Sequence, residues 1–322
     1  MATRHRPDGG KPRLLLIDDH RPLLDKVSAM LAADFDVAGL ATDGRQAIDI
    51  ANRIDPDLIV LDVQMPVLDG FRTMHELERA GSRAPVVFLS AAVDDDQASE
   101  AFRRGGRGYV SKLRIARDLS TALDQVLHGR LFAPSLTSLF ELTAGGGHHV
   151  MQRHRGMEPF LDGLARFFDR ALCRGDATCV IGTEDVRVGV ERRLRDAGWN
   201  VSANPRYLVI DVADALKRVL RNGLPDPDVV AEIASELDGY RRAVSAGPTG
   251  TLTVFGNMVV PLITGGNATA AVALEREWNR ATHDLPFVTL CGYSSSCFDG
   301  HTPDAWSKAC DEHGVVSHTA DT

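Results

Sequence analysis

Short apolar runs alternate with amphipathic segments through the first 131 residues, and this alternation limits the possible fold more than any other feature. The runs RLLLIDD (13–19), DLIVLD (57–62) and APVVFLS (84–90) stay apolar until polar residues close them, as parallel strands buried on both faces do. FDVAGLA (35–41) and GYVSK (108–112) complete five expected strands. Helical periodicity occupies the segments 21–34, 43–55, 71–81, 94–106 and 116–129. The pattern predicts a doubly wound, five-stranded parallel α/β sheet.

Polar side chains stand where four of these strands end. They are Asp18 and Asp19 on the first strand, Asp62, Ser90 and Lys112 on three others. In doubly wound sheets ligands bind at the carboxyl ends of the strands, so we expect these five side chains to share one edge.

These residue types fit phosphoryl transfer. The three aspartates offer the hard oxygen ligands that Mg²⁺ prefers, and Asp62 can also act as the nucleophile that forms an aspartyl phosphate. Mg²⁺ and Lys112 would offset the charge of the phosphoryl oxygens, to which Ser90 can donate a hydrogen bond. A single strand-end aspartate is usually a helix cap or a turn residue, but their order on successive strands favours the phosphoryl-transfer interpretation.

Four segments carry a family resemblance. LLLIDDH, LDVQMPVLDG, VVFLSA and GYVSKL resemble the signature segments of two-component response regulator receiver domains, over residues 12–131. The resemblance implies a flavodoxin-like fold in which a sensor histidine kinase phosphorylates Asp62. It also implies Mg²⁺ bound by Asp18, Asp19, Asp62 and the backbone carbonyl of Gln64. Ser90 and Tyr109 would be the switch pair, with Tyr109 rotating inward on phosphorylation, and Lys112 would sense the phosphate.

The details resemble the receivers of LuxR-type transcription factors. These details are DDH, the LSA turn, Leu113 in place of the usual proline, and LHGRLFAPSLT. Such receivers act as dimers and normally continue into a basic helix-turn-helix, which this sequence does not. We therefore expect a homodimer with a different output.

The second half is also α/β, with expected strands at 177–183, 207–212, 251–257 and 286–293. We expect a linker at 132–156, a domain at 157–300 and a C-terminal tail at 301–322. The segments GMEPFLDGLARFFDRALCRGDATCVIGT, DPDVV, TLTVFGNMV, EREWN and LCGY resemble the MEDS sensory domain, named from methanogens, methylotrophs and a dichloromethane-responsive regulator. The resemblance implies a RecA-like or KaiC-like module that binds a small ligand or a partner.

The second half shows no catalytic motif. The stretch VIGTEDVRVGVE lacks the GK[ST] of a P-loop, and GYSSS lacks the closing glycine of a nucleophile elbow. We expect His148, His149 and His154 to be solvated in the linker rather than to bind a metal, because they have no fixed spacing to acids or thiols. The cysteines form no CxxC pair, so we do not expect a zinc site. The five cysteines, Cys291 and Cys297 of CGYSSSC among them, are expected to be reduced and mostly buried. Met258 and Trp278 are expected to fill the core.

The net charge of −8 argues against a nucleic-acid partner. No apolar run reaches the length of a membrane span, and we expect a cytoplasmic protein. The sequence thus predicts a response regulator, with no enzymatic activity beyond its own phosphorylation and dephosphorylation. Phosphorylation would change either the dimerisation of the protein or the binding of a ligand or partner by its MEDS-like output domain. We expect that this output domain does not bind DNA. The alternative is a transcriptional regulator with an unrecognised DNA-binding surface.

Overall fold

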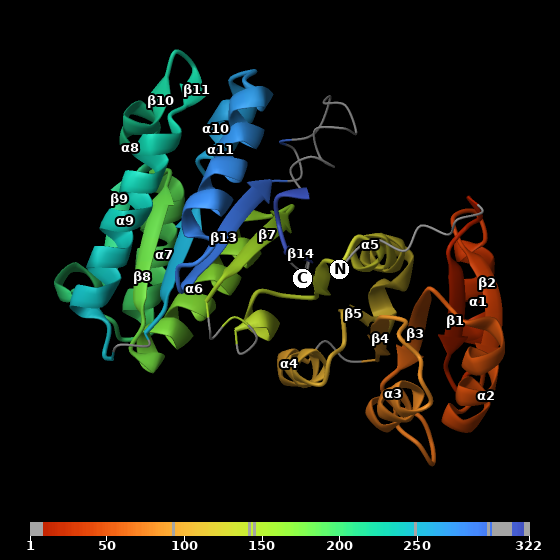
Figure 1. The fold of residues 1–322 in the computed structure, drawn as a ribbon. Helices are drawn as coiled ribbons and strands as arrows, with labels where there is room; N and C mark the ends of the chain where they lie inside the picture. The colour runs from red at the N-terminus through yellow and green to blue at the C-terminus, as the bar shows by residue number, and fades with distance from the viewer. Residues whose placement is uncertain are drawn as a thin grey trace. The chain divides into compact units, whose positions relative to one another are not determined.

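The computed structural model describes residues 9–91, 94–140, 143, 146–247, 250–294, 297 and 311–318. The chain divides into two compact units, Met1–Pro134 and Ser135–Thr322, which can be followed by colour in Figure 1. Each unit has its own hydrophobic core. Among the described residues, no helix is both long and apolar enough to cross a membrane.

The first unit is a parallel sheet with the strand order β2-β1-β3-β4-β5, and the short β6 pairs with β5 at its edge. Its strands are β1 (Arg13–Ile17), β2 (Asp36–Ala41), β3 (Leu58–Asp62), β4 (Val86–Ser90), β5 (Gly108–Ser111) and β6 (Leu131–Ala133). Its helices are α1 (Arg21–Leu31), α2 (Gly44–Ile54), α3 (Gly70–Arg79), α4 (Asp95–Arg103) and α5 (Ile115–Leu127). This confirms the expected doubly wound sheet, in the order of flavodoxin-like folds.

Both faces of this sheet are covered, which explains why its central strands are almost wholly apolar. β3 and β4 are buried at every residue. Leu14, Leu58 and Val87 pack with α1 and α5 on one face, whereas Phe88 faces Phe71 of α3, with 5.1 Å between the ring centroids.

The start of α3 fixes the position of Asp62. Asp69 caps this helix by accepting a hydrogen bond from the Arg72 amide, and Gly70 follows as the first helical residue. A Cβ atom on Gly70 would clash with the backbone carbonyl oxygen of Asp62. Only glycine lets the helix approach the end of β3 this closely.

The second unit is a parallel sheet with the order β14-β7-β13-β12-β8-β9. Its strands are β7 (His148–His154), β8 (Ala177–Gly182), β9 (Tyr207–Asp211), β12 (Leu252–Gly256), β13 (Phe287–Ser294) and β14 (Val315–His318). Its helices are α6 (Met157–Arg174), α7 (Glu184–Asp196), α8 (Val212–Val219), α9 (Pro227–Val244), α10 (Val259–Thr264) and α11 (Ala268–Thr282). A small hairpin, β10 (Leu220–Arg221) and β11 (Leu224–Pro225), follows α8.

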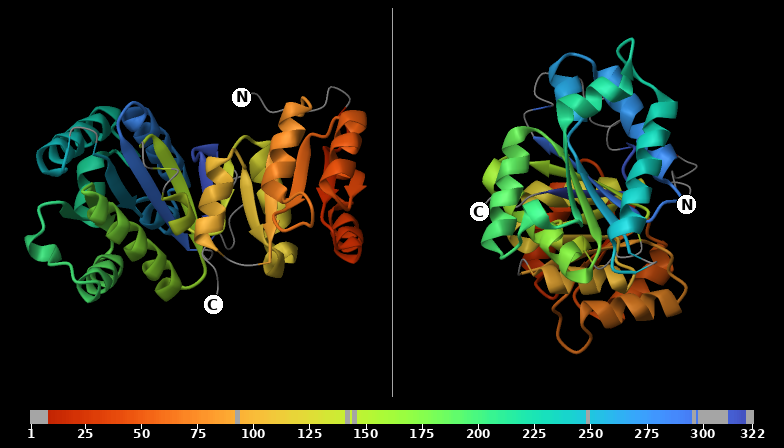
Figure 2. Two further views of the ribbon diagram at one scale, coloured as in Figure 1. Left: turned by 90° about the horizontal axis from the view of Figure 1, so that it is seen from below. Right: turned by 90° about the vertical axis from the view of Figure 1, so that its left-hand side faces the viewer.

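Helices cover both faces of this second sheet as well. Side chains of α8, α9, α10 and α11 form hydrophobic clusters with one face. On the other face, Phe160 of α6 contacts Phe255 of β12, with 5.7 Å between the ring centroids. Figure 2 shows the strands of this unit between the green helices α6 and α7 and the cyan-to-blue helices.

Two expected boundaries are wrong. The residues expected to form a linker, 132–156, contain the end of β6, a 3₁₀ turn at Thr137–Leu139 and all of β7. The expected tail contains β14, which pairs with β7; residues 301–310 and 319–322 lie outside the described part of the chain. β7 was missed because its sequence, HHVMQRH, has only two apolar residues and three histidines.

The histidines of β7 are therefore not a solvated group. His149 is 9% exposed and His154 is 7% exposed. The His154 ring stacks on Phe160, with 4.2 Å between the ring centroids and 14° between the planes. Burial lowers the pKa of His154 from 6.5 to about 4.

Replacing His154 by Phe should make stability less sensitive to acid. His154 takes up a proton near pH 6.5 in the unfolded chain but only near pH 4 in the folded chain. The unfolding free energy therefore decreases as the pH falls from 6.5 to about 4, because protonation favours the unfolded chain in this range. Between pH 7.5 and pH 5 the wild type should lose about 2 kcal/mol more unfolding free energy than His154→Phe. Urea unfolding at both pH values measures this difference, and equal losses in the two proteins would contradict it.

Candidate functional site

The structure brings the predicted strand-end residues to one edge of the first sheet. Asp18 follows β1, Asp62 ends β3, Ser90 ends β4 and Lys112 follows β5. These four strands are consecutive neighbours in the sheet, so their carboxyl ends converge there.

Three carboxylates form an acidic cluster. Ligand oxygens of Asp18, Asp19 and Asp62 all lie within 4.8 Å of one another. Asp18 and Asp62 are buried, whereas Asp19 is exposed. The cluster therefore consists of two buried carboxylates and one carboxylate that solvent reaches. This donor set suits Mg²⁺, which takes carboxylate oxygens and keeps several waters.

Lys112 holds the two buried carboxylates together. Its Nζ lies 2.7 Å from Oδ2 of Asp18 and 2.7 Å from Oδ2 of Asp62. Burial raises the pKa of Asp62, and the ion pair with Lys112 opposes that rise. Burial also acts to lower the pKa of Lys112, but its hydrogen bonds to the two carboxylates outweigh burial and raise it. Lys112 is thus a fixed positive charge at neutral pH.

Backbone amides orient the other carboxylate oxygens. The His20 amide donates to Oδ1 of Asp18 at 2.9 Å, and the Gln64 amide donates to Oδ1 of Asp62 at 3.2 Å. The Gln64 backbone is therefore at the site. The predicted role of its carbonyl as a metal ligand remains a prediction.

Ser90 and Tyr109 meet at a residue that the sequence analysis missed. Ser90 Oγ donates to Oε1 of Gln97 at 2.8 Å, and the Tyr109 hydroxyl donates to the same oxygen at 2.7 Å. Both hydroxyl residues are fully buried. Tyr109 already points inward in this conformation, so the expected inward rotation is not needed here. Nothing in DDDQASEAF distinguishes Gln97 from an ordinary helix residue, because its role depends on two other elements.

Two family models match this chain. Residues 14–124 match the family described as the response regulator receiver domain, and residues 148–308 match MEDS, the methanogen/methylotroph, DcmR sensory domain. The nitrate/nitrite response regulator NarL of Escherichia coli K12 is 36% identical over 120 residues, which are 37% of this chain and 56% of NarL. The Fimbriae Z protein of Salmonella typhimurium LT2 is 31% identical over 147 residues, 44% of this chain and 70% of that protein. The chain thus spans about half the length of NarL.

Solved receiver domains are also similar. The signal receiver domain of a NarL response regulator from Mycobacterium tuberculosis has 25% identity and a TM-score of 0.35, covering 37% of this chain and 98% of that one. A Francisella response regulator receiver domain has 26% identity and a TM-score of 0.34, and the match covers 37% of this chain and 97% of that one. The first unit is a response regulator receiver domain, and through its second unit the chain belongs to the MEDS family.

A double-mutant cycle should reveal the bridge made by Gln97. Gln97→Leu leaves buried hydroxyls without this acceptor and should cost about 1–3 kcal/mol of unfolding free energy. Tyr109→Phe alone should cost less, and the double variant should be clearly more stable than the sum of the two single losses predicts. Chemical unfolding of the four proteins provides the energies. Strict additivity would mean that the two side chains do not interact.

Proposed function

We propose that this chain is a phosphorylation-controlled response regulator whose receiver domain accepts a phosphoryl group on Asp62 from a sensor histidine kinase. The observation that carries the proposal is the group of Asp18, Asp19, Asp62 and Lys112 at the ends of neighbouring strands. Beyond its own phosphorylation and dephosphorylation, we propose no enzymatic activity for the chain.

The reaction needs an ionised Asp62. One of its carboxylate oxygens attacks the phosphorus, and the bond from phosphorus to the donor nitrogen breaks as the new P–O bond forms. Lys112 helps to keep Asp62 ionised despite its burial. Its ammonium group lies beside the attacking oxygens and would stabilise the negative charge of the transferred group.

Mg²⁺ fits this site as the cofactor. Asp18, Asp19 and Asp62 would hold it, because their oxygens are close together and one of the three carboxylates is exposed. When bound, the ion would neutralise charge on the phosphoryl oxygens. Before it arrives, Lys112 is the cation between the two buried carboxylates.

Asp62→Asn should abolish phosphorylation. With acetyl phosphate and Mg²⁺, the wild type should gain one phosphoryl group in its intact mass, and Asp62→Asn should gain none, because an amide is not a nucleophile of this kind. Asp57→Asn is a matched control, since Asp57 precedes the same strand and accepts a hydrogen bond from the Arg13 amide. Phosphorylation of Asp62→Asn to the wild-type level would refute the assignment.

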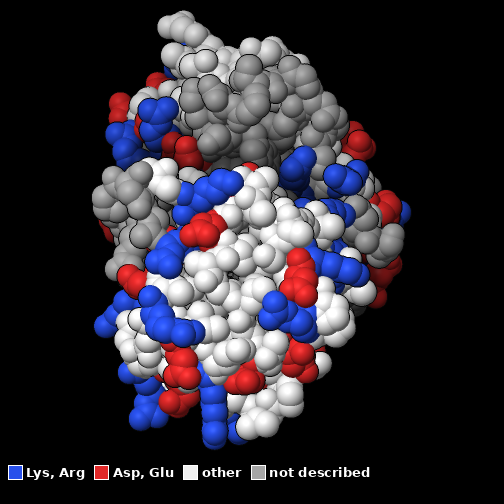
Figure 3. Space-filling model, turned by 90° about the vertical axis from the view of Figure 1, so that its right-hand side faces the viewer, with Lys and Arg blue, Asp and Glu red and all other residues white. Residues whose placement is uncertain are grey.

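For the output we propose a homodimer and a second unit that does not bind DNA. The homodimer is proposed from the resemblance to LuxR-type receivers, and the net charge of −8 supports only the second part, that the unit does not bind DNA. DNA-binding surfaces carry a basic patch or stripe that attracts the phosphate backbone. Figure 3 faces the first unit, and there basic and acidic side chains are interspersed.

A cavity in the second unit supports binding of a small apolar ligand. It has a volume of about 270 Å³ and lies between β8, β9 and the helices α8, α9 and α11. Its lining is mostly aliphatic and aromatic, with Ile181, Leu208, Ile210, Ala215, Leu237, Met258 and Trp278 among its members. Met258 and Trp278 also pack against the core, as expected. Trp278 is held by its indole N–H, which donates to Oγ1 of Thr289 at 2.8 Å.

Filling the cavity should abolish binding of a small apolar probe. Benzene should raise the melting temperature of the wild type, because a ligand that binds only the folded state stabilises it. Ala215→Leu places extra side-chain atoms in the cavity and should remove that rise. Ala213→Leu, on the exposed side of the same helix, is the control and should keep it. A rise that persists in Ala215→Leu would place the probe elsewhere.

A further inference from the structure

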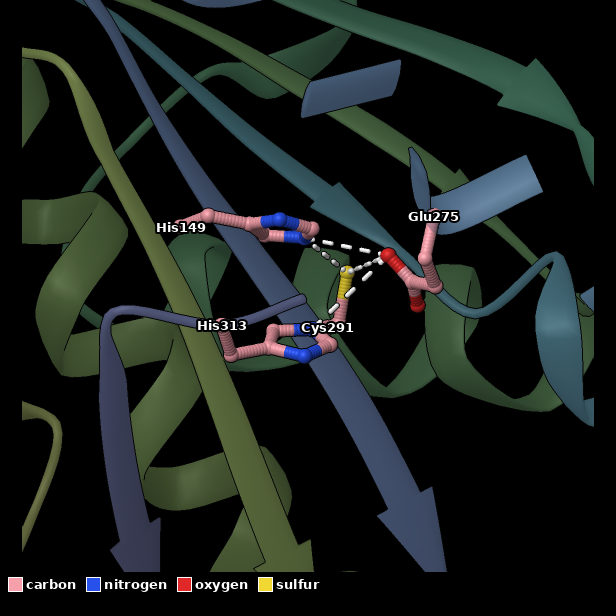
Figure 4. Close-up of side chains that lie close together, drawn as sticks. All are labelled: His149, Glu275, Cys291 and His313. Carbon is pink, nitrogen blue, oxygen red and sulfur yellow. Dashed lines mark hydrogen bonds and ion pairs between the residues drawn. The ribbon is translucent and has the colours of Figure 1, made fainter. Parts of the chain in front are cut away.

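Four side chains from separate segments of the chain meet inside the second unit. They are His149 of β7, Glu275 of α11, Cys291 of β13 and His313, which lies just before β14. Figure 4 shows the four side chains pointing toward one another. All are buried, with exposures of 9%, 4%, 6% and 2% in that order. An apolar core would usually place aliphatic side chains here, so the cluster needs a physical explanation.

The distances match a tetrahedral metal site. His149 Nε2 lies 3.0 Å from Cys291 Sγ and 3.2 Å from Glu275 Oε2. Glu275 Oε2 lies 3.7 Å from Cys291 Sγ and 3.7 Å from His313 Nε2. Bonds of about 2.0–2.3 Å to a tetrahedral Zn²⁺ place the ligand atoms about 3.3–3.8 Å apart. Small side-chain movements would therefore complete the shell.

Further side chains orient these ligands. Nδ1 of His149 lies 2.6 Å from Oδ1 of Asn279, and the amide nitrogen of Asn279 donates to the backbone oxygen of Glu312. The amide is thereby oriented with its oxygen toward His149, so Nδ1 is the donor, and in the neutral ring the lone pair of Nε2 faces the cluster. The Tyr293 hydroxyl donates to Oε1 of Glu275, which leaves Oε2 toward the other three residues. Metal-binding histidines and carboxylates are commonly oriented in this way.

Charge points to a divalent cation. A buried carboxylate is costly unless it is compensated. In a metal-bound site, a Glu275 carboxylate and a Cys291 thiolate would together carry two negative charges, and the two imidazoles would be neutral ligands. A divalent ion would make the group neutral overall, which is the least costly way to bury it.

We propose that His149, Glu275, Cys291 and His313 bind one Zn²⁺ ion or a closely similar divalent transition metal. Two imidazole nitrogens, a thiolate and a carboxylate are ligands that Zn²⁺ accepts, whereas Mg²⁺ and Ca²⁺ require oxygen ligands. Four protein ligands fill a tetrahedral shell and leave no position for substrate, so the site is structural or sensory.

The bound ion would stabilise the packing of β14 against the rest of the second unit. His313 is followed by β14, which pairs with β7 from Val315 to His318, and the Gly314 amide donates to the backbone oxygen of His149. Metal bound between His149 and His313 would strengthen this pairing. Metal binding should therefore slow hydrogen exchange in residues 313–317.

Cobalt titration of the full chain tests the proposal. Protein dialysed against a chelator is titrated with Co²⁺ in excess Mg²⁺, which occupies the acidic cluster of the receiver. The wild type should develop a thiolate-to-cobalt charge-transfer band and strong visible absorption, saturating at one Co²⁺ per chain, and Zn²⁺ should displace both. Cobalt bound to aspartate oxygens gives no thiolate band, so the two sites are distinguishable.

Three variants complete the test. Cys291→Ser should lose the thiolate band, and Cys179→Ser, which removes a buried thiol from β8, should keep it. His313→Gln should keep the band but bind Co²⁺ more weakly. Asn279→Ala should also keep the band, with an affinity for Co²⁺ about 10–100-fold lower. A band that persists in Cys291→Ser would overturn the assignment. The assignment would also be overturned if the wild type has a native circular dichroism spectrum but develops no band. The four residues would then form a hydrogen-bond network without a metal.

Discussion

The receiver site depends on the ion pairs that the ammonium group of Lys112 makes with two buried carboxylates. Two buried carboxylates repel each other and lose their hydration, and neither change is favourable without a compensating cation. Lys112 lies 2.7 Å from both Asp18 and Asp62, so one positive charge joins the ends of β1, β3 and β5. A bound metal ion or a phosphoryl group would compete directly with these ion pairs, which links the chemistry at Asp62 to the position of the residues after β5.

The second unit buries its carboxylate in a different way. Glu275 lies among two imidazoles, a thiol and a tyrosine hydroxyl. These groups can hydrogen-bond to a carboxylate, and three of them can also bind a metal together with it. The same helix, α11, carries Trp278 toward the apolar cavity, so one element of the fold contributes to both features of this unit.

Much of the fold could be predicted from the sequence where burial follows a simple pattern. The central strands of the first unit are almost wholly apolar because helices cover both faces of the sheet, and β8, β12 and β13 were found for the same reason. The pattern failed at β7, where His149 and His154 occupy buried positions. The partner of His154, Phe160, lies on the next helix along the chain, but Asn279, the partner of His149, is 130 residues away, and no local pattern connects it to this strand.

The sequence by itself determined the identity and order of the receiver residues. Alternating strands and helices predict a parallel sheet, and the carboxyl ends of parallel strands share one edge, where Asp18, Asp62 and Lys112 therefore lie. Only the tertiary structure decided that Gln97 bridges Ser90 and Tyr109 and that four metal-ligand side chains meet in the second unit. His149 and Cys291 are 142 residues apart, and side chains so distant become neighbours only through the pairing of β7 with β13 and the packing of α11 on the sheet. Strand-end positions follow from periodicity, whereas contacts between faces of separate elements depend on how those elements pack.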